Sequence, residues 1–229
     1  MRKFSRRDII FEDNHLIVVN KHSGSIVQSD ITGDTPISEE IKSYIKKKYN
    51  KPGNVYLGII HRLDRPTSGV MVFAKTSKCL NRLNVQFKER TVKKIYWAIV
   101  TKHPKINYGK LEHWLIKNQK QNKSYAYDSE LTNSKKSILE FKTLKKLENY
   151  NLIEIKLDTG RHHQIRAQLS KINIIIKGDV KYGSKRPNND GSIDLHSRKL
   201  SFSHPIDGTK LDFKSRLPKR QPWNSVLCD

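Results

Sequence analysis

The apolar residues of this chain are gathered into short runs of strand length, and segments with helical spacing lie between them. The clearest strand-like runs are Leu16–Val19, Tyr56–Ile60, Val70–Ala74, Ile95–Val100 and Leu152–Thr159. In the last run Ile153, Ile155 and Leu157 alternate with other residues, which is typical of a strand with one buried face. None of the runs approaches the roughly 18 apolar residues of a membrane-spanning helix. The pattern therefore favours a folded chain built on a sheet.

Three segments repeat apolar residues at helical spacing. The first follows Asp34–Pro36, which offers a helix cap and a first-turn proline. The apolar positions of the expected helices are Ile37, Ile41, Tyr44 and Ile45, then Leu80, Leu83 and Phe87 within Ser77–Arg90, and lastly Ile165, Leu169 and Ile172. Because strands and helices are mixed along the whole chain, we predict an α+β (mixed α/β) fold.

Nothing in the sequence resembles a linker between domains. The best candidate, Arg186–Ser192, is typical of a surface loop. We therefore predict a single domain over residues 1–229.

The chain is strongly basic. Its 229 residues include 45 Lys and Arg against 22 Asp and Glu, so the formal net charge is +23. The cations are spread from Lys42 to Arg220, which favours a folded basic face over a disordered arm. A polyanion such as nucleic acid is the expected partner, and an anionic membrane surface is the main alternative.

Targeting and disulfide signals are weak. The basic start Met1–Arg7 is followed by alternating residues and then by charge at Glu12 and Asp13, so we do not expect a signal peptide. The two cysteines, Cys79 and Cys228, lie far apart in the sequence, which excludes a disulfide framework and favours a reducing cytoplasm.

The segment His61–Gly69 carries a carboxylate between two arginines. Asp64 has Arg62 two residues before it and Arg65 beside it. Such cations favour the ionised form, which suits a nucleophile or base near a phosphate-bearing substrate. The alternative is a turn in which Asp64 caps its own backbone and Gly69 supplies the turn dihedral. Spacing alone favours this alternative.

A second segment gathers basic residues near an expected helix start, namely Arg161, His162, His163 and Arg166. Backbone N–H groups there bind anions, whereas basic side chains are unfavourable, so the cluster suggests a function. The alternative is a solvated basic first turn. Metal binding is less expected, because adjacent histidines on a helix point to different sides and no HExxH or Cys pair accompanies them.

A third segment, Lys93–Val100, contains Tyr96 on a predicted strand. Tyr96 would share a face with Ala98 and Val100, as a core residue does. Such a residue is most often part of the core, but near a polyanion site it could instead stack on a nucleic-acid base. Spacing does not decide between the two.

Taken together, five ordered segments resemble the RluA-type family of RNA pseudouridine synthases. They are His61–Gly69 (similar to HRLDxxTSG), Lys94–Val100 (KxYxAxV), Gly160–Arg166 (GRxHQIR), Gly178–Gly183, and Leu195–Pro205 (similar to LHAxxLxFxHP). The stretch Ile9–Lys21 also resembles the opening strands of the family. Modest departures are His162, where Thr is common, and Ala167-Gln168, where Val-His is common. Five motifs in order are far more specific than one.

The resemblance implies a single catalytic domain with a central, largely antiparallel sheet, flanking helices and a catalytic cleft. It implies that uridines in ribosomal or transfer RNA are isomerised to pseudouridine without a cofactor or a metal. It also implies no N-terminal accessory RNA-binding domain, since Asp8 already begins the catalytic part. RNA is then the expected partner of a cytoplasmic monomer that binds no membrane.

The resemblance also assigns roles to residues. Asp64 is expected to be the catalytic carboxylate, Tyr96 to lie against the uracil ring, and Arg166 to keep Asp64 ionised. Arg62 is expected to fill the gap left by the flipped base or to bind phosphate. Further RNA contacts are expected from Arg161, His163 and Gln164.

Three other classes of protein are less compatible with the sequence. A glycosidase needs two carboxylates across the bond, and no second acid recurs near the motifs. A metal-dependent nuclease needs an acidic or histidine cluster, and the 22 acids scattered among 45 basic residues offer none. A non-catalytic RNA-binding module would explain the charge but leaves Asp64 without a purpose.

Overall fold

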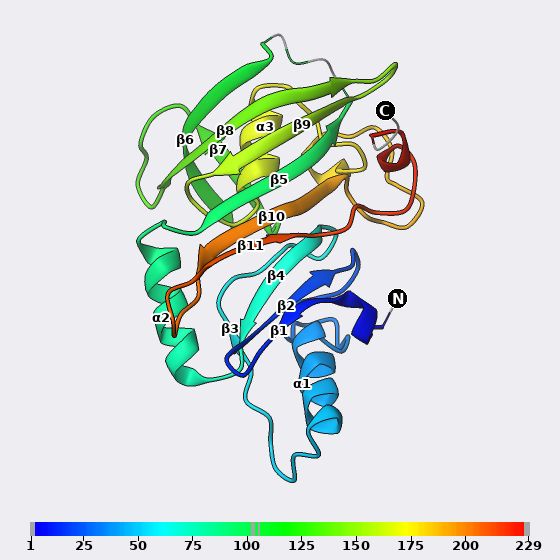
Figure 1. Ribbon diagram of the computed structural model, residues 1–229. Helices are drawn as coiled ribbons and strands as arrows, with labels where there is room; N and C mark the ends of the chain where they lie inside the picture. The colour runs from blue at the N-terminus through cyan, green and yellow to red at the C-terminus, as the bar shows by residue number, and fades with distance from the viewer. Residues whose placement is uncertain (1–2, 102–103, 105, 227–229) are drawn as a thin grey trace. The chain divides into compact units, whose positions relative to one another are not determined.

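The computed structural model describes residues 3–101, 104 and 106–226, which group into two compact units (Figure 1). Unit 1 comprises Met1–Val92 and Ser197–Arg216, and unit 2 comprises Lys93–His196 and Leu217–Asp229. Helices and antiparallel strands are mixed, so the predicted α+β class is confirmed. The single domain over residues 1–229 stays a prediction.

Unit 1 is a small antiparallel sheet with two helices. Its strands lie in the order β1-β2-β4-β10, and β3 and β11 pair with β4 and β10. Its elements are β1 (Ile9–Glu12), β2 (Leu16–Lys21), α1 (Ile37–Lys48), β3 (Gly58–Ile59), β4 (Ser68–Ala74), α2 (Ser77–Lys88), β10 (Leu195–Ser203, in this unit from Ser197) and β11 (Lys210–Lys214). A 3-10 turn over Arg6–Asp8 precedes β1.

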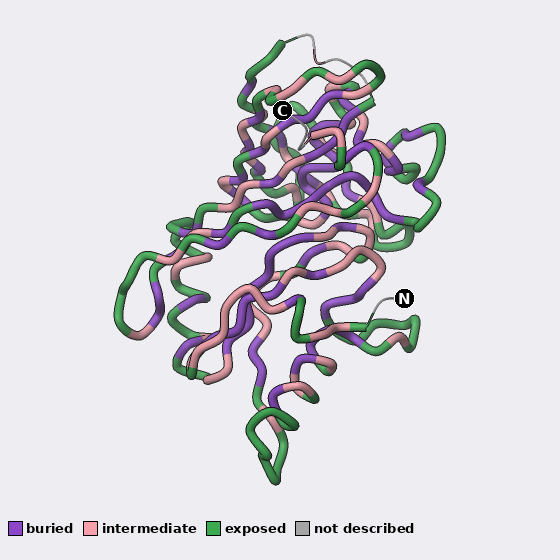
Figure 2. The backbone as a smooth tube through the Cα atoms, turned by 45° about the vertical axis from the view of Figure 1, so that its right-hand side comes forward, coloured by how far each residue is buried: buried purple, intermediate pink, exposed green. Residues whose placement is uncertain are grey.

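The core of unit 1 comes from the residues that sequence periodicity selected. In α2 the buried Leu83 and the partly buried Leu80 and Phe87 pack against strand residues such as Val72, as the helical spacing predicts. Thr76 caps this helix, because its hydroxyl accepts a hydrogen bond from the Cys79 N–H at 3.2 Å. Figure 2 shows the buried parts of the strands in purple.

Two sequence expectations for unit 1 need correction. Pro36 is the N-cap residue of α1 rather than a first-turn residue, and no side chain caps this helix. The strand expected over Tyr56–Ile60 is only two residues long, because only Gly58 and Ile59 pair with β4.

Cys79 is buried and free, and Cys228 lies outside the described residues.

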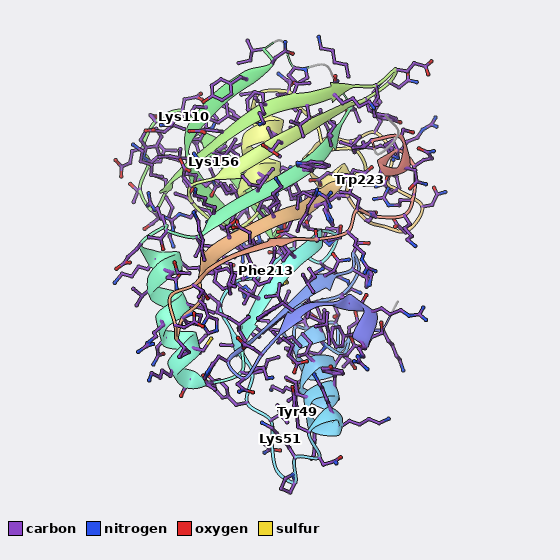
Figure 3. All side chains as sticks on the ribbon, in the orientation of Figure 1. Tyr49, Lys51, Lys110, Lys156, Phe213 and Trp223 are labelled. Carbon is purple, nitrogen blue, oxygen red and sulfur yellow. The ribbon has the colours of Figure 1, made fainter. Side chains whose placement is uncertain are left out.

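Glu12 at the end of β1 fixes α1 to the sheet. Its carboxylate accepts hydrogen bonds from Lys48 at 2.7 Å and from Lys75 at 2.9 Å. Tyr49, labelled in Figure 3, lies at the C-terminal end of α1. Its hydroxyl donates to the same carboxylate at 3.0 Å. Several donors on the partly enclosed carboxylate of Glu12 stabilise the fold more than isolated ion pairs on the surface do.

Unit 2 is an antiparallel sheet with α3 on one face. Its strands lie in the order β5-β9-β8-β6-β7. The elements are β5 (Lys93–Val100), β6 (Tyr108–Asn118), β7 (Lys123–Tyr127), β8 (Lys135–Lys146), β9 (Asn151–Leu157), α3 (Gln164–Lys171) and 3-10 turns at Val180–Tyr182 and Trp223–Val226. In β9, Ile153, Ile155 and Leu157 are buried, as predicted. The expected Ile172 is the residue that ends α3.

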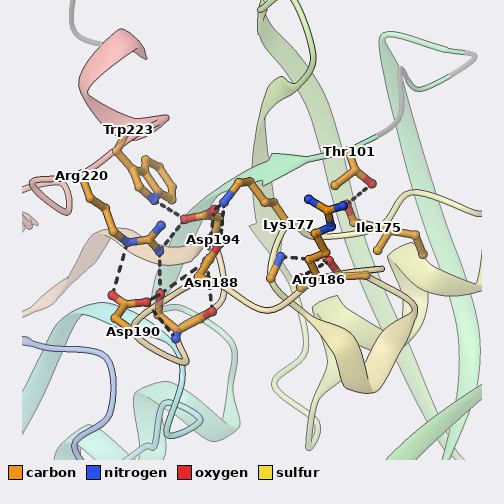
Figure 4. A network of polar contacts seen from close by, with 12 residues as sticks. Thr101, Ile175, Lys177, Arg186, Asn188, Asp190, Asp194, Arg220 and Trp223 are labelled. Atoms are coloured by element: carbon orange, nitrogen blue, oxygen red, sulfur yellow. Dashed lines mark hydrogen bonds and ion pairs between the residues drawn. The ribbon is translucent and has the colours of Figure 1, made fainter.

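The C-terminal segment of unit 2 is held by a buried acid (Figure 4). The carboxylate of Asp194 accepts from Arg220 at 2.6 Å and from the Trp223 indole N–H at 2.7 Å, and the Lys177 ammonium lies 3.3 Å away. The Trp223 ring in turn packs with Ile99 on the face of β5. In the neighbouring surface loop, predicted over Arg186–Ser192, no helix or strand forms. Within the described ranges, none of the helices has the length and hydropathy of a membrane span.

Candidate active site

In unit 1 the segment His61–Gly69 leads from β3 into the start of β4 and contains a tight turn over Asp64–Thr67. The Thr67 N–H donates to the Asp64 carbonyl at 3.0 Å, and Leu63 and Thr67 are buried beneath the turn. Asp64 itself is half-buried. The turn therefore has a rigid base and one partly accessible carboxylate.

Lys21, at the end of β2, supports this turn from inside the protein. Its side chain is fully buried, and its ammonium donates to the carbonyls of His22 at 3.0 Å, Arg65 at 3.3 Å and Thr67 at 2.8 Å. Burial lowers the pKa of Lys21 to about 7, the negative charge of Asp64 opposes this shift, and Arg65 adds to it. Lys21 thus links the backbone of the turn to the core, and below about pH 7 it also contributes positive charge near Asp64.

The two arginines that flank Asp64 have different surroundings. Arg65 pairs with Asp34 at 2.6 Å, and its backbone carbonyl accepts from the Gly24 N–H at 2.8 Å. Arg62 has an exposed side chain. Arg65 therefore anchors the turn to a neighbouring loop, whereas Arg62 faces the solvent.

Gly69 allows β4 to approach β10 closely. Its φ of +122° is in the region that favours glycine, and a Cβ there would lie 2.3 Å from the carbonyl oxygen of Ser197. The Ser197 hydroxyl donates to the Val70 carbonyl at 3.1 Å, which ties the two strands just after the turn. Gly69 therefore supplies more than the turn dihedral that the sequence suggested.

In unit 2 Arg166 of α3 is tied to an acid, Asp179. Arg166 is buried, and its Nε and one terminal nitrogen donate to the two oxygens of Asp179 at 2.7 and 2.8 Å. The Tyr182 ring lies 4.9 Å from the guanidinium carbon. This two-point geometry fixes both the position and the rotation of the guanidinium.

The histidines before α3 are not on a helix. His163 is the N-cap residue in the left-handed conformation with φ 51°, and its ring stacks on that of His162 at 3.8 Å between centroids. The expectation that the two rings point to different sides of a helix is therefore wrong. His163 Nδ1 lies 3.0 Å from the Tyr182 hydroxyl, and His162 Nδ1 lies 2.8 Å from the Ser124 hydroxyl. Burial and then the charge of Arg166 lower the pKa of His163 to about 2, so its imidazole is neutral.

Gln164 closes the turn before α3. Its carbonyl oxygen accepts from the Thr159 hydroxyl at 2.8 Å and from the Arg161 N–H at 2.9 Å, while its amide donates to the Ile138 carbonyl at 3.1 Å. The side chain is buried, and these hydrogen bonds hold the turn in place. Arg161 is exposed.

Tyr96 lies in β5 opposite Ile155 of β9 and is buried, as are Ala98 and Val100 on the same face. This is the face that the sequence analysis expected for it.

Within the described residues, no group of three or more His, Cys, Asp or Glu side chains is placed to hold a metal ion.

Comparison with known proteins decides the family. The sequence profile described as RNA pseudouridylate synthase matches residues 15–171. The dual-specificity RNA pseudouridine synthase RluA of Haemophilus influenzae is 33% identical over 213 residues, which cover 91% of this chain and 92% of that protein. This chain belongs to the RNA pseudouridylate synthase family.

Other members of the family agree with this assignment. The ribosomal large subunit pseudouridine synthase D of Zymomonas mobilis is 32% identical over 93% of this chain, and that of Borreliella burgdorferi is 35% identical over 93%. The chain spans 69% and 65% of the lengths of these two relatives. The structure of human RNA pseudouridylate synthase domain containing 4 has the same fold, with a TM-score of 0.77, 24% identity, and coverage of 93% of this chain and 89% of that one. The predicted family and fold are confirmed.

The residues with predicted roles are divided between the two units. Asp64 and Arg62 lie in unit 1, whereas Tyr96, Arg161, His163, Gln164 and Arg166 lie in unit 2. Their roles, and the pairing of Asp64 with Arg166, stay predictions.

Sequence reasoning assigned no role to Lys21, Asp179 or Tyr182. All three lie in stretches that resemble the family, but their partners come from distant parts of the sequence. Their position in those stretches was the one available signal.

Proposed function

We propose that this chain isomerises uridines of ribosomal or transfer RNA to pseudouridine. In this reaction the bond between ribose C1′ and base N1 breaks, and a bond between C1′ and C5 forms. The proton on C5 is lost and N1 gains one, so the reaction consumes no second substrate. We further propose that it needs no metal or cofactor and that the chain acts as a cytoplasmic monomer.

Asp64 is the proposed catalytic carboxylate. The observation that carries this assignment is the support of its turn by the buried ammonium of Lys21, which binds the carbonyls of Arg65 and Thr67. A nucleophile must be held close to its attack geometry, and a turn bonded to the core at two carbonyls provides this. A carboxylate so placed would bond to ribose C1′ as the bond from C1′ to N1 breaks, and would leave as C5 of the base bonds to C1′.

Tyr96 and Arg166 complete the proposed site. Tyr96 would lie against the uracil ring, and Arg166 would keep Asp64 ionised, since a close guanidinium favours the carboxylate. The ion pair with Asp179 supports this role, because it holds Arg166 in one orientation. Arg62 and Arg161 are exposed cations suited to RNA phosphates, and His163 and Gln164 shape the turn that presents Arg161.

The test is nucleoside analysis of RNA after incubation with the chain in the presence of a chelator. Ribosomal RNA transcripts, transfer RNA transcripts or both should gain pseudouridine with the natural chain and none with Asp64→Asn, while the RNA affinity of Asp64→Asn stays within a few fold. Asp34→Asn, which removes a carboxylate beside Arg65 of the same turn, is the matched control and should retain turnover.

Other products would overturn the proposal. Strand breaks would indicate a nuclease, released uracil a glycosidase, and binding without any product an RNA-binding module. Substantial turnover by Asp64→Asn would contradict the role of that carboxylate, and activity that returns only with a divalent ion would contradict catalysis without a metal.

A further inference from the structure

The β6–β7 hairpin lies at the edge of the unit 2 sheet (Figure 1). The register of its two strands gives it an aromatic outer face. Trp114 lies opposite Tyr127, and Ile116 lies opposite Tyr125, so these four side chains share one face of the hairpin. Tyr125 and Tyr127 are 37% and 38% exposed, and Trp114 and Ile116 are half-buried.

The inner face of the same hairpin is covered. Leu115 is buried with Ala167 of α3, and Ala126 packs against them. Because neighbouring residues of a strand point to opposite faces, the four outer side chains point away from α3.

This outer face is also opposite to the face of Tyr96. Tyr96 pairs with Ile155, Ile155 with Phe141, and Phe141 with Gly109 of β6. Gly109 and Leu115 are an even number of residues apart, so Tyr96 lies on the same side of the sheet as α3. The aromatic outer face is therefore separate from the proposed catalytic residues of unit 2.

Two of the rings on this face, those of Trp114 and Tyr125, each have a lysine ammonium nearby. The Lys136 ammonium lies 5.6 Å from the Trp114 ring centroid, and that of Lys123 lies 5.3 Å from the Tyr125 ring. The hairpin turn and the loop to β8 are basic overall, since residues 117–136 hold Lys117, Lys120, Lys123, Lys135 and Lys136 but only two acids, Asp128 and Glu130.

Two acids of this part of the sheet, one in β6 and one directly after β7, are paired with cations. Glu112 lies 2.5 Å from Lys136, and Asp128 lies 2.8 Å from Lys171 of α3. Both pairs are largely exposed, so each acid offsets a single lysine and leaves the region with an excess of positive charge.

We propose that the outer face formed by Trp114, Ile116, Tyr125 and Tyr127, with Lys123 and Lys136, is a second RNA-binding surface. Unpaired bases would stack on the exposed rings, and the lysines would contact the adjoining phosphates. A protein partner fits less well, because lysine is depleted in protein–protein interfaces whereas here it borders the rings. This inference rests on the proposed function, since it assigns a further contact to the RNA substrate.

The test compares the natural chain with the double variant Tyr125→Ala/Tyr127→Ala. The dissociation constant for an RNA substrate with unpaired flanks should rise about tenfold or more, because stacking on two rings is lost. The rate at saturating RNA should stay within about threefold, since neither tyrosine is proposed to touch the reacting base. Photo-crosslinking should join the RNA to the peptide that contains Tyr125 and Tyr127.

Tyr108→Ala is the matched control. Tyr108 is also exposed, at 61%, and lies in β6 about 20 Å along the strand from Trp114. Its replacement should leave the affinity nearly unchanged, and an equal loss in control and double variant would overturn the proposal.

The remaining outcomes separate this inference from the proposed function. Pseudouridine formation with unchanged affinity in the double variant would refute the second surface alone. Tight RNA binding that needs the tyrosines, without pseudouridine formation, would refute the proposed function alone. If light scattering shows a dimer that the double variant abolishes, the face is an interface between copies and the proposal fails.

Discussion

Arg166 of α3 and Asp179 form a two-point ion pair in which both side chains are buried, with 6% and 1% of their surfaces exposed. A bidentate guanidinium–carboxylate pair combines charge attraction with a fixed geometry. Breaking such a pair in the interior leaves a charge without compensation, which costs far more than loss of a surface pair. Asp179 is therefore the residue that sets where the Arg166 guanidinium lies in unit 2.

We predict that Asp179→Asn lowers the free energy of unfolding by about 3–5 kcal/mol, because it breaks a buried two-point ion pair with Arg166. Urea denaturation measures this loss. Asp128→Asn, which breaks an exposed pair with Lys171, should hardly move the midpoint. The double variant Asp179→Leu/Arg166→Met should lose less stability than the sum of the losses in Asp179→Leu and in Arg166→Met. Strictly additive losses would argue against the pair.

The stability that Lys21 contributes should depend on pH. Its pKa is about 7 in the folded chain and about 10.4 when unfolded, so between these values the unfolded chain binds more protons. The free energy of unfolding should therefore rise with pH. From pH 7 to 8.5 the natural chain should gain on the order of 1–2 kcal/mol relative to Lys21→Met.

Urea denaturation of both chains across that range provides the measurement. Lys21→Met should also be less stable at every pH, because it removes the donor that three carbonyls share. The exposed Lys51 offers the control Lys51→Met, which should have little effect. Parallel pH profiles for the natural chain and Lys21→Met would refute the prediction.

Replacement of Gly69 by alanine should destabilise the chain by about 3 kcal/mol or more, because the new Cβ would collide with the Ser197 carbonyl and the φ is unfavourable. Gly53→Ala is the matched control, since nothing lies within 4 Å of a Cβ there. It should change the stability by less than about 1 kcal/mol. Thermal or urea midpoints distinguish the two, and similar midpoints would contradict the close approach of β4 and β10.

Acid should destabilise the chain partly through His163. The folded chain keeps this imidazole neutral to about pH 2, whereas an unfolded histidine takes up a proton near pH 6.5. Below pH 6.5 the unfolded chain binds more protons, so stability falls as the pH falls. Between pH 7.5 and 5.5 the loss should be about 1.4 kcal/mol. His163→Gln should remove this part of the slope, and equal slopes would speak against a neutral histidine.

RNA affinity should fall steeply with salt, because the net charge of +23 implies many phosphate contacts. If roughly six or more phosphates are neutralised, the affinity should drop about a thousandfold or more between 50 and 200 mM salt. Fluorescence titrations with one RNA at several salt concentrations measure the slope. A flat dependence would mean that contacts other than phosphate neutralisation dominate.

The sequence predicted those elements in which apolar residues form a continuous run or repeat at a regular spacing. β2, β4 and β9 follow from apolar runs or clean alternation, and the buried face of α2 follows from its helical spacing. The strands β6, β7 and β8 were not predicted. In β8, for example, Leu139 and Phe141 are buried, but the lysines at both ends and the small Ser137 obscure the period of two.

The candidate site divides in the same way. The turn around Asp64 and the basic turn before α3 were visible in the sequence, because their unusual residues are neighbours along the chain. The support of that turn by Lys21 and the pairing of Arg166 with Asp179 join residues that only the fold brings together. The stacking of His162 on His163 depends on a left-handed backbone that propensity does not predict for histidine.

The part of β10 that pairs with β4 in unit 1 begins at Ser197. One edge of β4 therefore has no partner strand during much of the chain's synthesis. β4 ends at Ala74, and its neighbour begins about 120 residues later. At about 5–20 residues per second, a ribosome needs roughly 6–25 s to make that stretch. Throughout that time the nascent chain carries an unpaired, apolar strand edge that can pair with another molecule. A premature stop before Ser197 would leave this edge open permanently, and truncated chains should therefore depend on chaperones or aggregate.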